Sequence, residues 1–198
     1  MEPDAFALLG LPRRASLGAE EVRAAFQRAA AACHPDGAAD EVERAERTLR
    51  FQQLNEASRC LVPVASRLRH LLALESPGAK VSRAALMDEV LVALFTAVGA
   101  AVGEAAEWVQ RRQAARTFLA RAALAAREIE VQEKLEAAGG ALRQAREALQ
   151  EALGRADAAR AAGLDQGEVL GPLGQRAAFL EKWQAQIEAA WGSLFVAS

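Results

Sequence analysis

Residues 19–36 read AEEVRAAFQRAAAACHPD, and this stretch decides the fold of the N-terminal region. Its apolar side chains recur at helical spacing: Val22, Phe26, Ala29 and Cys33. This period predicts a helix over residues 19–33 with one apolar face. Pro35 lacks a backbone N–H and disfavours helical geometry at His34, so the helix should end there. The imidazole of His34 and the carboxylate of Asp36 are therefore expected on a stiff, solvent-facing loop.

The flanking sequence predicts a helical hairpin around this loop. Before it, the apolar run ending at Gly10 predicts a short helix or turn, and the Ser16 hydroxyl is expected to cap the 19–33 helix. After it, a second apolar stripe recurs at helical spacing: Phe51, Leu54, Ala57 and Leu61. Two such faces can close on each other as an antiparallel pair. Arg23 and Arg28 lie off the apolar face, so with the loop they form a candidate docking surface.

This arrangement resembles the J-domain, the module that couples a co-chaperone to a DnaK-type chaperone ATPase. The residues that carry the resemblance are Phe6, Leu8-Leu9-Gly10-Leu11, Val22-Arg23-Ala24-Ala25-Phe26, His34-Pro35-Asp36, Phe51, Leu54, Asn55, Ala57 and Leu61. Their order and spacing are far more specific than the tripeptide alone. The chain departs from the pattern at Cys33, where an aromatic is usual, at Gly37, where a lysine is usual, and at Gln27, a commonly basic position.

Composition bounds the remaining possibilities. The 198 residues carry a net charge of −2, which indicates no nucleic-acid partner. Tyrosine is absent and strong helix formers dominate, so we expect an all-α protein. The two cysteines, Cys33 and Cys60, fall on apolar helix faces and are expected to be buried free thiols in a reducing compartment. The N-terminus has no charged-then-apolar signal pattern, which favours a cytoplasmic location.

Catalysis is not expected. Only His34 and His70 offer an imidazole base, and no nucleophile pattern accompanies either. The sequence has no glycine-rich phosphate loop and no metal-ligand spacing, so no cofactor and no metal are predicted.

A second domain is predicted after the break at residues 76–79, giving a J-domain over 1–75 and an antiparallel bundle of three or four helices over 76–198. Ser82 is expected to cap the first bundle helix, Gly139-Gly140 to end a helix, and Asp165 to cap the last one. The apolar run over residues 90–103 is too short to span a bilayer and indicates a buried helix, so no membrane partner is expected.

The second half carries a narrower resemblance, to the HscB-type co-chaperones of iron–sulfur cluster assembly. The residues that carry it are Leu61, Pro63, Arg67, Leu71-Leu72-Ala73-Leu74, Leu86-Met87-Asp88-Glu89-Val90 and Phe179-Leu180-Glu181-Lys182-Trp183. In that family, residues matching Leu86, Met87, Val90 and Phe179 belong to an apolar patch that holds the iron–sulfur scaffold protein. The residues themselves leave ordinary bundle core as an equal alternative, because apolar residues at helical spacing usually are core.

The resemblance implies a co-chaperone that is not itself an enzyme. It would bind a DnaK/HscA-type ATPase through His34, Pro35, Asp36, Arg23 and Arg28, stimulate ATP hydrolysis there, and deliver an iron–sulfur scaffold as client. The alternative is a divergent J-domain interaction protein whose client is unrelated to iron–sulfur assembly.

Overall fold

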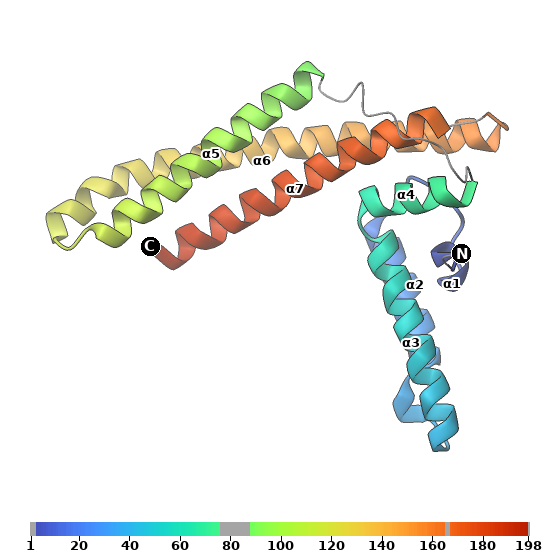
Figure 1. Ribbon diagram of the computed structural model, residues 1–198. Coiled ribbons are helices and arrows are strands. Elements are labelled where there is room, and N and C mark those ends of the chain that lie inside the picture. Colours follow the sequence, from blue (N-terminus) through green and yellow to red (C-terminus); the bar gives the residue numbers. More distant parts are fainter. Residues whose placement is uncertain (1–2, 76–87, 165–166, 198) are drawn as a thin grey trace. The chain divides into compact units, whose positions relative to one another are not determined.

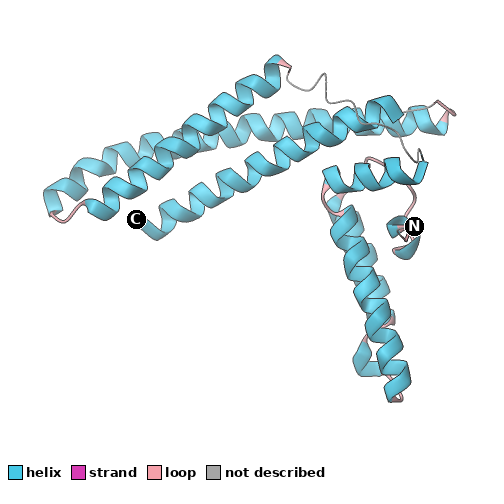
Figure 2. Cartoon of the chain, viewed as in Figure 1, coloured by secondary structure: helices cyan, strands magenta, loops and turns pink. Residues whose placement is uncertain are grey.

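The chain folds entirely into helices, turns and loops over the residues that its computed structural model describes, namely 3–75, 88–164 and 167–197 (Figures 1 and 2). The helices are α1 (Ala5–Leu8), α2 (Ala19–Ala32), the short 3-10 turn η1 (Pro35–Gly37), α3 (Glu41–Leu61), α4 (Val64–Glu75), α5 (Glu89–Ala114), α6 (Phe118–Ala161) and α7 (Gly167–Ala197). This confirms the predicted all-α class. Leu86, Met87, Ser82 and Asp165 lie outside the described residues.

Two compact units divide the chain. The first comprises residues 1–83 with 150–177, and the second comprises 84–149 with 178–198. The α1–α4 region thus shares its unit with the last turns of α6 and the first turns of α7. The predicted boundary at residue 75 stays a prediction.

The first unit is built on the α2–α3 hairpin. Its buried side chains come from the facing stripes of these helices and from α1, and include Phe6, Val22, Ala25, Leu54, Ala57 and Leu61. Phe26 and Phe51 are half-buried and their ring centroids lie 6.1 Å apart. The apolar period of the sequence therefore identified the packed face. Cys33 and Cys60, expected to be buried, are both partly exposed.

The short helix α1 is held by polar contacts as well as by burial of Phe6. Asp4 caps it by accepting hydrogen bonds from the N–H groups of Phe6 and Ala7. The buried His70 of α4 accepts a hydrogen bond from the Ala5 N–H through Nε2 at 3.0 Å, and its ring stacks on Phe6. His70 thus has a structural role in the N-terminal region.

Ser16 does not cap α2, which was the expectation from sequence. The N-cap is Gly18, two residues later, and no side chain accepts there. Instead the N–H groups of Ala15 and Ser16 donate to the two carboxylate oxygens of Asp157 on α6, at 2.7 and 2.8 Å. Asp157 binds the loop before α2 in the way that a helix cap binds a first turn.

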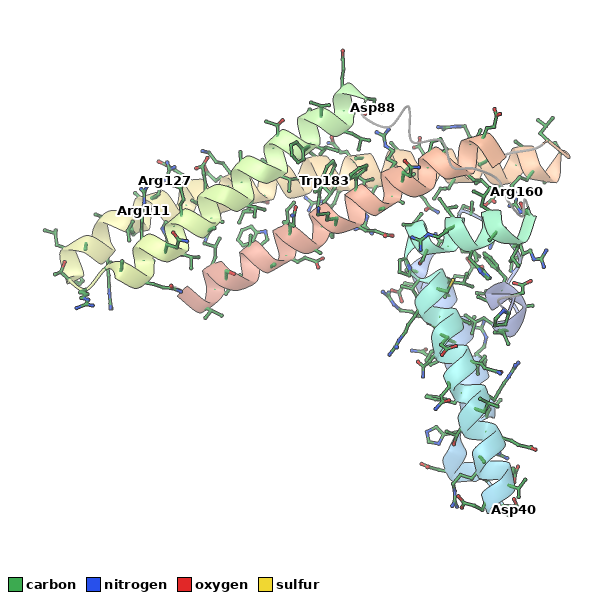
Figure 3. All side chains as sticks on the ribbon, in the orientation of Figure 1. Asp40, Asp88, Arg111, Arg127, Arg160 and Trp183 are labelled. Carbon is green, nitrogen blue, oxygen red and sulfur yellow. The ribbon has the colours of Figure 1, made fainter. Side chains whose placement is uncertain are left out.

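We call the contacts of Asp157 with the loop before α2 the Asp157 junction. Arg160, one turn after Asp157 on α6, extends it. Its guanidinium forms an ion pair with Glu75 at the end of α4 and donates to the Asp157 carboxylate at 2.9 Å and to the Arg13 carbonyl at 3.1 Å (Figure 3). Gln150 adds a hydrogen bond of 2.7 Å to the Ser16 carbonyl. The C-terminal turns of α6 are therefore bound to both ends of the α2–α4 region.

The Asp157 junction predicts a pH-dependent stability. Burial of Asp157 opposes ionisation. The Ser16 hydroxyl, the Ala15 and Ser16 N–H groups and the Arg160 cation outweigh it and hold the pKa of this carboxyl below its ordinary value. A lowered folded-state pKa gives stability that is present above the unfolded pKa and is lost as the pH falls through the folded one.

Asp157→Asn should therefore destabilise the first unit by about 1–3 kcal/mol near neutral pH, because one N–H loses its charged acceptor. The deficit should shrink as the pH falls below about 4. Denaturant unfolding of both proteins across pH measures this. A deficit that stays constant into acid would contradict the assignment.

The second unit is a bundle of α5 with the adjoining parts of α6 and α7. Each helix contributes one buried stripe: Leu91, Leu94, Val98, Ala101, Ala105 and Trp108; Val131, Leu135, Ala138, Leu142 and Ala145; Leu180, Trp183, Ile187, Ala190 and Leu194. The spacing of three and four in every stripe is that of a core-facing helix surface. Among the described residues this gives three bundle helices, within the predicted range.

Gly139-Gly140 does not end a helix, contrary to prediction. α6 runs unbroken for 44 residues through both glycines. Glycine costs about 1 kcal/mol relative to alanine inside a helix. The buried neighbours Leu135, Ala138 and Leu142 continue one apolar stripe across the pair, and this burial outweighs the cost. Pro172 lies inside α7 and does not end it.

α5 is longer than the apolar run that the sequence suggested. Its 26 residues are long and apolar enough to cross a membrane by length and composition, with a mean hydropathy of 1.6 over its best window, of which 28% is buried. It is the one such helix among the described residues. Most of this window is exposed, with Val92 and Phe95 among its exposed side chains, so the predicted buried helix is wrong for most of this run. Asp88 caps it by accepting from the Leu91 N–H at 2.8 Å. At Gly99 and Gly103 nothing packs closely, so this pair does not mark a tight helix crossing.

Candidate functional site

The loop between α2 and α3 presents two polar side chains to solvent. α2 ends at its C-cap Cys33, and Pro35 opens the short turn η1. The side chains of His34 and Asp36 are 56% and 91% exposed. The structure thus places an imidazole and a carboxylate together on a turn of fixed backbone.

Local hydrogen bonds fix how these two groups lie. The Asp36 N–H donates to Nδ1 of His34 at 3.3 Å, and one carboxylate oxygen of Asp36 lies 3.5 Å from the same nitrogen. The first contact uses the lone pair of Nδ1, so Nε2 is the ring nitrogen that can donate to a partner. A partner would meet an N–H donor beside a carboxylate acceptor.

Phe51 and Arg47 of α3 both contact His34 and hold the loop in place. The Phe51 ring meets the His34 ring edge-on at 6.3 Å. The Arg47 guanidinium donates to the His34 carbonyl at 3.2 Å and is itself oriented by two hydrogen bonds to Glu43. Hydrogen bonds from the Ala39 N–H and from Arg47 lower the pKa of Glu43, which keeps this carboxylate charged. The loop is therefore held by α3 as well as by its proline.

Gly37 makes room for this support. A Cβ at position 37 would lie 2.8 Å from Nη1 of Arg47, so any side chain there would displace the guanidinium from the His34 carbonyl. Gly37 therefore leaves the space that the Arg47 guanidinium occupies. Sequence reasoning missed Arg47, although the Glu43–Arg47 spacing of four residues was a readable signal for an ion pair.

The two arginines predicted beside the loop differ in their surroundings. Arg23 is half-exposed and forms an ion pair with Glu20 on α2. Arg28 is exposed and has no ion-pair partner within the part of the chain that the structure describes. The cationic character of this helix face therefore rests mainly on Arg28.

Two of the four residues of the predicted apolar patch, Val90 and Phe179, lie among the described residues. Phe179 is half-buried and stacks on Trp183 at 5.8 Å, and Trp183 also meets Phe95 of α5 at 6.4 Å (Figure 3). Phe95 is 58% exposed. These three rings form one cluster, the aromatic cluster, with an accessible side on α5. Sequence reasoning did not single out Phe95 or assign Trp183 to this surface.

Val90 is exposed, as a patch residue should be, but it lies on another side of α5. At 100° per residue, Val90 is about 140° around the helix axis from Phe95. The buried stripe that contains Leu91 and Leu94 runs between them. Phe179 and Val90 therefore flank the core from different directions, and Leu86 and Met87 are outside the described residues.

The described residues contain no cluster of three His, Cys, Asp or Glu side chains with the geometry to hold a metal ion. The two histidines are accounted for by the exposed loop and by the contact with α1.

Comparison with known proteins agrees with this geometry. Residues 4–69 match the DnaJ domain family. Two solved structures of HscB share the fold across nearly the whole chain. Chaperone HscB from Vibrio cholerae gives a TM-score of 0.57 at 17% identity, covering 97% of this chain and 99% of that one. Human co-chaperone protein HscB gives 0.53 at 15% identity, covering 94% and 81%. No curated protein sequence matches.

Proposed function

Residues 4–69 form a J-domain and the chain has an HscB-like fold, and from this premise we propose that the protein is a co-chaperone of a DnaK/HscA-type ATPase. The observation that carries the proposal is the exposed His34-Pro35-Asp36 loop, held by Phe51 and Arg47 without being covered by them. The partner performs ATP hydrolysis. This chain supplies an ordered surface on which the partner's hydrolysis-competent state is stabilised.

Arg28 and, more weakly, Arg23 would extend that surface toward an acidic region of the ATPase. Charge pairs of this kind mainly raise the association rate and weaken as salt screens them. Because Arg23 already has an ion-pair partner in Glu20, whereas Arg28 has none among the described residues, reversing Arg28 should have the larger effect on binding and should flatten its salt dependence.

The proposed role of the His34-Pro35-Asp36 loop is tested by measuring single-turnover ATP hydrolysis by a purified DnaK-type chaperone in the presence of this protein. His34→Gln and Asp36→Asn should each abolish stimulation, because the first changes the donor at Nε2 and the second removes the charged acceptor. Both groups are exposed, so thermal stability should change by less than about 0.5 kcal/mol. Glu46→Gln, an exposed change on α3, is the matched control and should stimulate normally. Full stimulation by both loop variants would refute the co-chaperone function.

We further propose that the bundle carries the client and that the client is an iron–sulfur scaffold protein. The support is the HscB-like fold together with the aromatic cluster, in which the exposed Phe95 and the half-buried Phe179 pack on the buried Trp183. Exposed aromatic rings on a rigid helical surface are typical anchors of protein interfaces. Val90, Leu86 and Met87 remain proposed client-binding residues from the resemblance. The position of Val90 away from the cluster favours the second candidate, a client unrelated to iron–sulfur assembly.

Replacing Phe179 with alanine distinguishes a residue that binds a client from a residue of the core. If Phe179 anchors a client, Phe179→Ala and Phe95→Ala should each weaken binding of the purified scaffold at least tenfold, with a small loss of stability. If Phe179 is core, its truncation should cost about 3–5 kcal/mol. Leu49→Ala, at an exposed site on α3, is the control. Calorimetric titration and thermal melts give both readouts. Unchanged scaffold affinity in all variants would favour the unrelated client.

A further inference from the structure

The turn between α5 and α6 concentrates positive charge. Over residues 108–126 there is no Asp or Glu, whereas four arginines occur: Arg111, Arg112, Arg116 and Arg121. The chain as a whole carries a net charge of −2, so this end of the second unit departs from the rest of the sequence. We define residues 111–121 as the basic tip.

Three arginines of the basic tip, Arg111, Arg116 and Arg121, are exposed to an external anion. Arg111 is two-thirds exposed and reaches only an equally exposed Glu107, at 3.5 Å (Figure 3). Arg116 is exposed and forms no ion pair with any residue that the structure describes. Arg121 is exposed and donates through Nε to the Ala115 carbonyl at 3.1 Å. Exposed ion pairs such as Arg111–Glu107 are weak and exchange easily for another partner.

Two large apolar side chains stand among these arginines. Phe118 and Leu119, at the start of α6, are 88% and 79% exposed. Ile129, also exposed, lies on nearly the same face as Phe118, about 16 Å further along the helix. Single exposed apolar residues are ordinary, but an adjacent pair on an open turn that extends into an apolar helix face indicates an interaction site.

The end of α7 adds apolar surface in the same region. Val109 and Gln110 of α5 border one cavity together with Ala189 and Ser193 of α7, so the C-terminal turn of α7 lies beside the end of α5. Phe195 and Val196, in that last turn, are both highly exposed. Apolar side chains from two helices therefore gather near the basic tip.

We propose that the basic tip binds the surface of a bilayer that contains anionic phospholipid. Guanidinium groups pair with lipid phosphates, and Phe118 and Leu119 enter the boundary between headgroups and acyl chains. Leu119 favours lipid over nucleic acid, because an aliphatic side chain cannot stack on a base, whereas it gains from burial among acyl chains. Because residues 108–126 contain no Asp or Glu, the positive charge of the basic tip complements the negative charge of the lipid phosphates.

This contact is peripheral and does not use α5 as a spanning helix. Each arginine near an anionic surface strengthens binding roughly fivefold, and the attraction falls off with salt. The protein would therefore leave the membrane reversibly at high ionic strength. The sequence predicted no membrane partner, and it is the exposure of the tip that changes this expectation.

The test is flotation of the full chain with vesicles of phosphatidylcholine alone or with added phosphatidylglycerol. We expect flotation only with phosphatidylglycerol, and release by salt. Arg111→Glu with Arg116→Glu should weaken binding by roughly 25-fold or more, from two contributions of about fivefold each. Phe118→Ser with Leu119→Ser should weaken it at least tenfold while leaving ATPase stimulation intact.

Matched controls are Arg155→Glu, an exposed arginine elsewhere on α6, and Leu49→Ser on α3; both should float like the parent. Equal flotation of tip and control variants would overturn the proposal. So would salt-resistant association, which indicates insertion of α5, or retention by heparin and nucleic acid with no vesicle binding. Circular dichroism of each variant checks that its helices are intact. Because the readout needs no chaperone, its failure is distinct from failure of the co-chaperone function.

Discussion

Replacing Arg67 with alanine is expected to destabilise the first unit by about 3–5 kcal/mol, because two buried carbonyl groups lose a charged donor. Arg67 on α4 is only 1% exposed. Its Nε donates to the Ala15 carbonyl at 3.1 Å, and its Nη1 donates to the Leu61 carbonyl at 2.7 Å. Ala15 is the residue whose N–H donates to Asp157. The guanidinium therefore joins the end of α3, the loop before α2 and, through that loop, α6.

Two further variants separate lost hydrogen bonds from lost packing. Arg67→Met keeps most of the apolar stem and should recover part of the stability, since the long side chain of arginine also fills space. Arg69→Ala, two residues on and exposed, should stay within about 0.5 kcal/mol of the parent. Denaturant unfolding followed by circular dichroism gives the ranking. Equal stability of Arg67→Ala and Arg69→Ala would show that the buried guanidinium is not what holds α4 in place.

Trp108→Ala is expected to cost the second unit about 3–5 kcal/mol, the range for a large aromatic removed from a core. Trp108 lies in α5, is 2% exposed, and donates through Nε1 to the Leu124 carbonyl of α6 at 3.1 Å. It is the largest fully buried side chain among the described residues. Its loss leaves a cavity beside the turn that joins the two helices.

Hydrogen exchange measured peptide by peptide suits this variant, because two compact units need not unfold together. Protection should fall in α5 and in the first half of α6, and should be retained in α2 and α3. Trp108→Phe should cost about 1–2 kcal/mol, from the lost indole N–H and the smaller ring. Trp191→Ala, a partly exposed tryptophan on α7, is the control. Protection lost uniformly along the chain would contradict an independent second unit.

The proposed functions depend on different units of the molecule. Coupling to the ATPase would use the α2–α3 loop, whereas client and membrane contacts would use side chains of α5, α6 and α7. Asp157 and Arg160 bind the loop before α2 and the end of α4 to the last turns of α6, and Arg67 joins the same loop to the end of α3. Variants at this junction should lower stability without altering the loop directly, so they distinguish structural from functional loss.

Local signals were sufficient to predict the N-terminal hairpin. Pro35 ends a helix because of its own ring, and the apolar period of Val22 and Leu54 identifies the faces that bury. The exposure of His34 and Asp36 follows from the same facts, since both sit beside the helix break. These features depend on neighbours within a few residues, and that is why sequence alone determined them.

Contacts between distant residues decided the rest. The Ser16 hydroxyl, expected to cap α2, instead bonds the Asp157 carboxylate, as does the Ser16 N–H, and only the packed α6 makes this possible. Two adjacent glycines predict a helix end at Gly139-Gly140. Burial of the stripe through Leu135 and Leu142 outweighs the free-energy cost of glycine in the helix, so α6 continues. Val90 and Phe179 belong to one predicted patch, yet the rotation of α5 and its pairing with α7 bring Phe95, not Val90, to Trp183, which stacks on Phe179 one turn before it. The sequence determined which segments are helical and which residues carry the loop chemistry, because backbone propensity and apolar period act locally. The tertiary structure decided which faces meet and which side chains stay exposed, because burial depends on residues far apart in the chain.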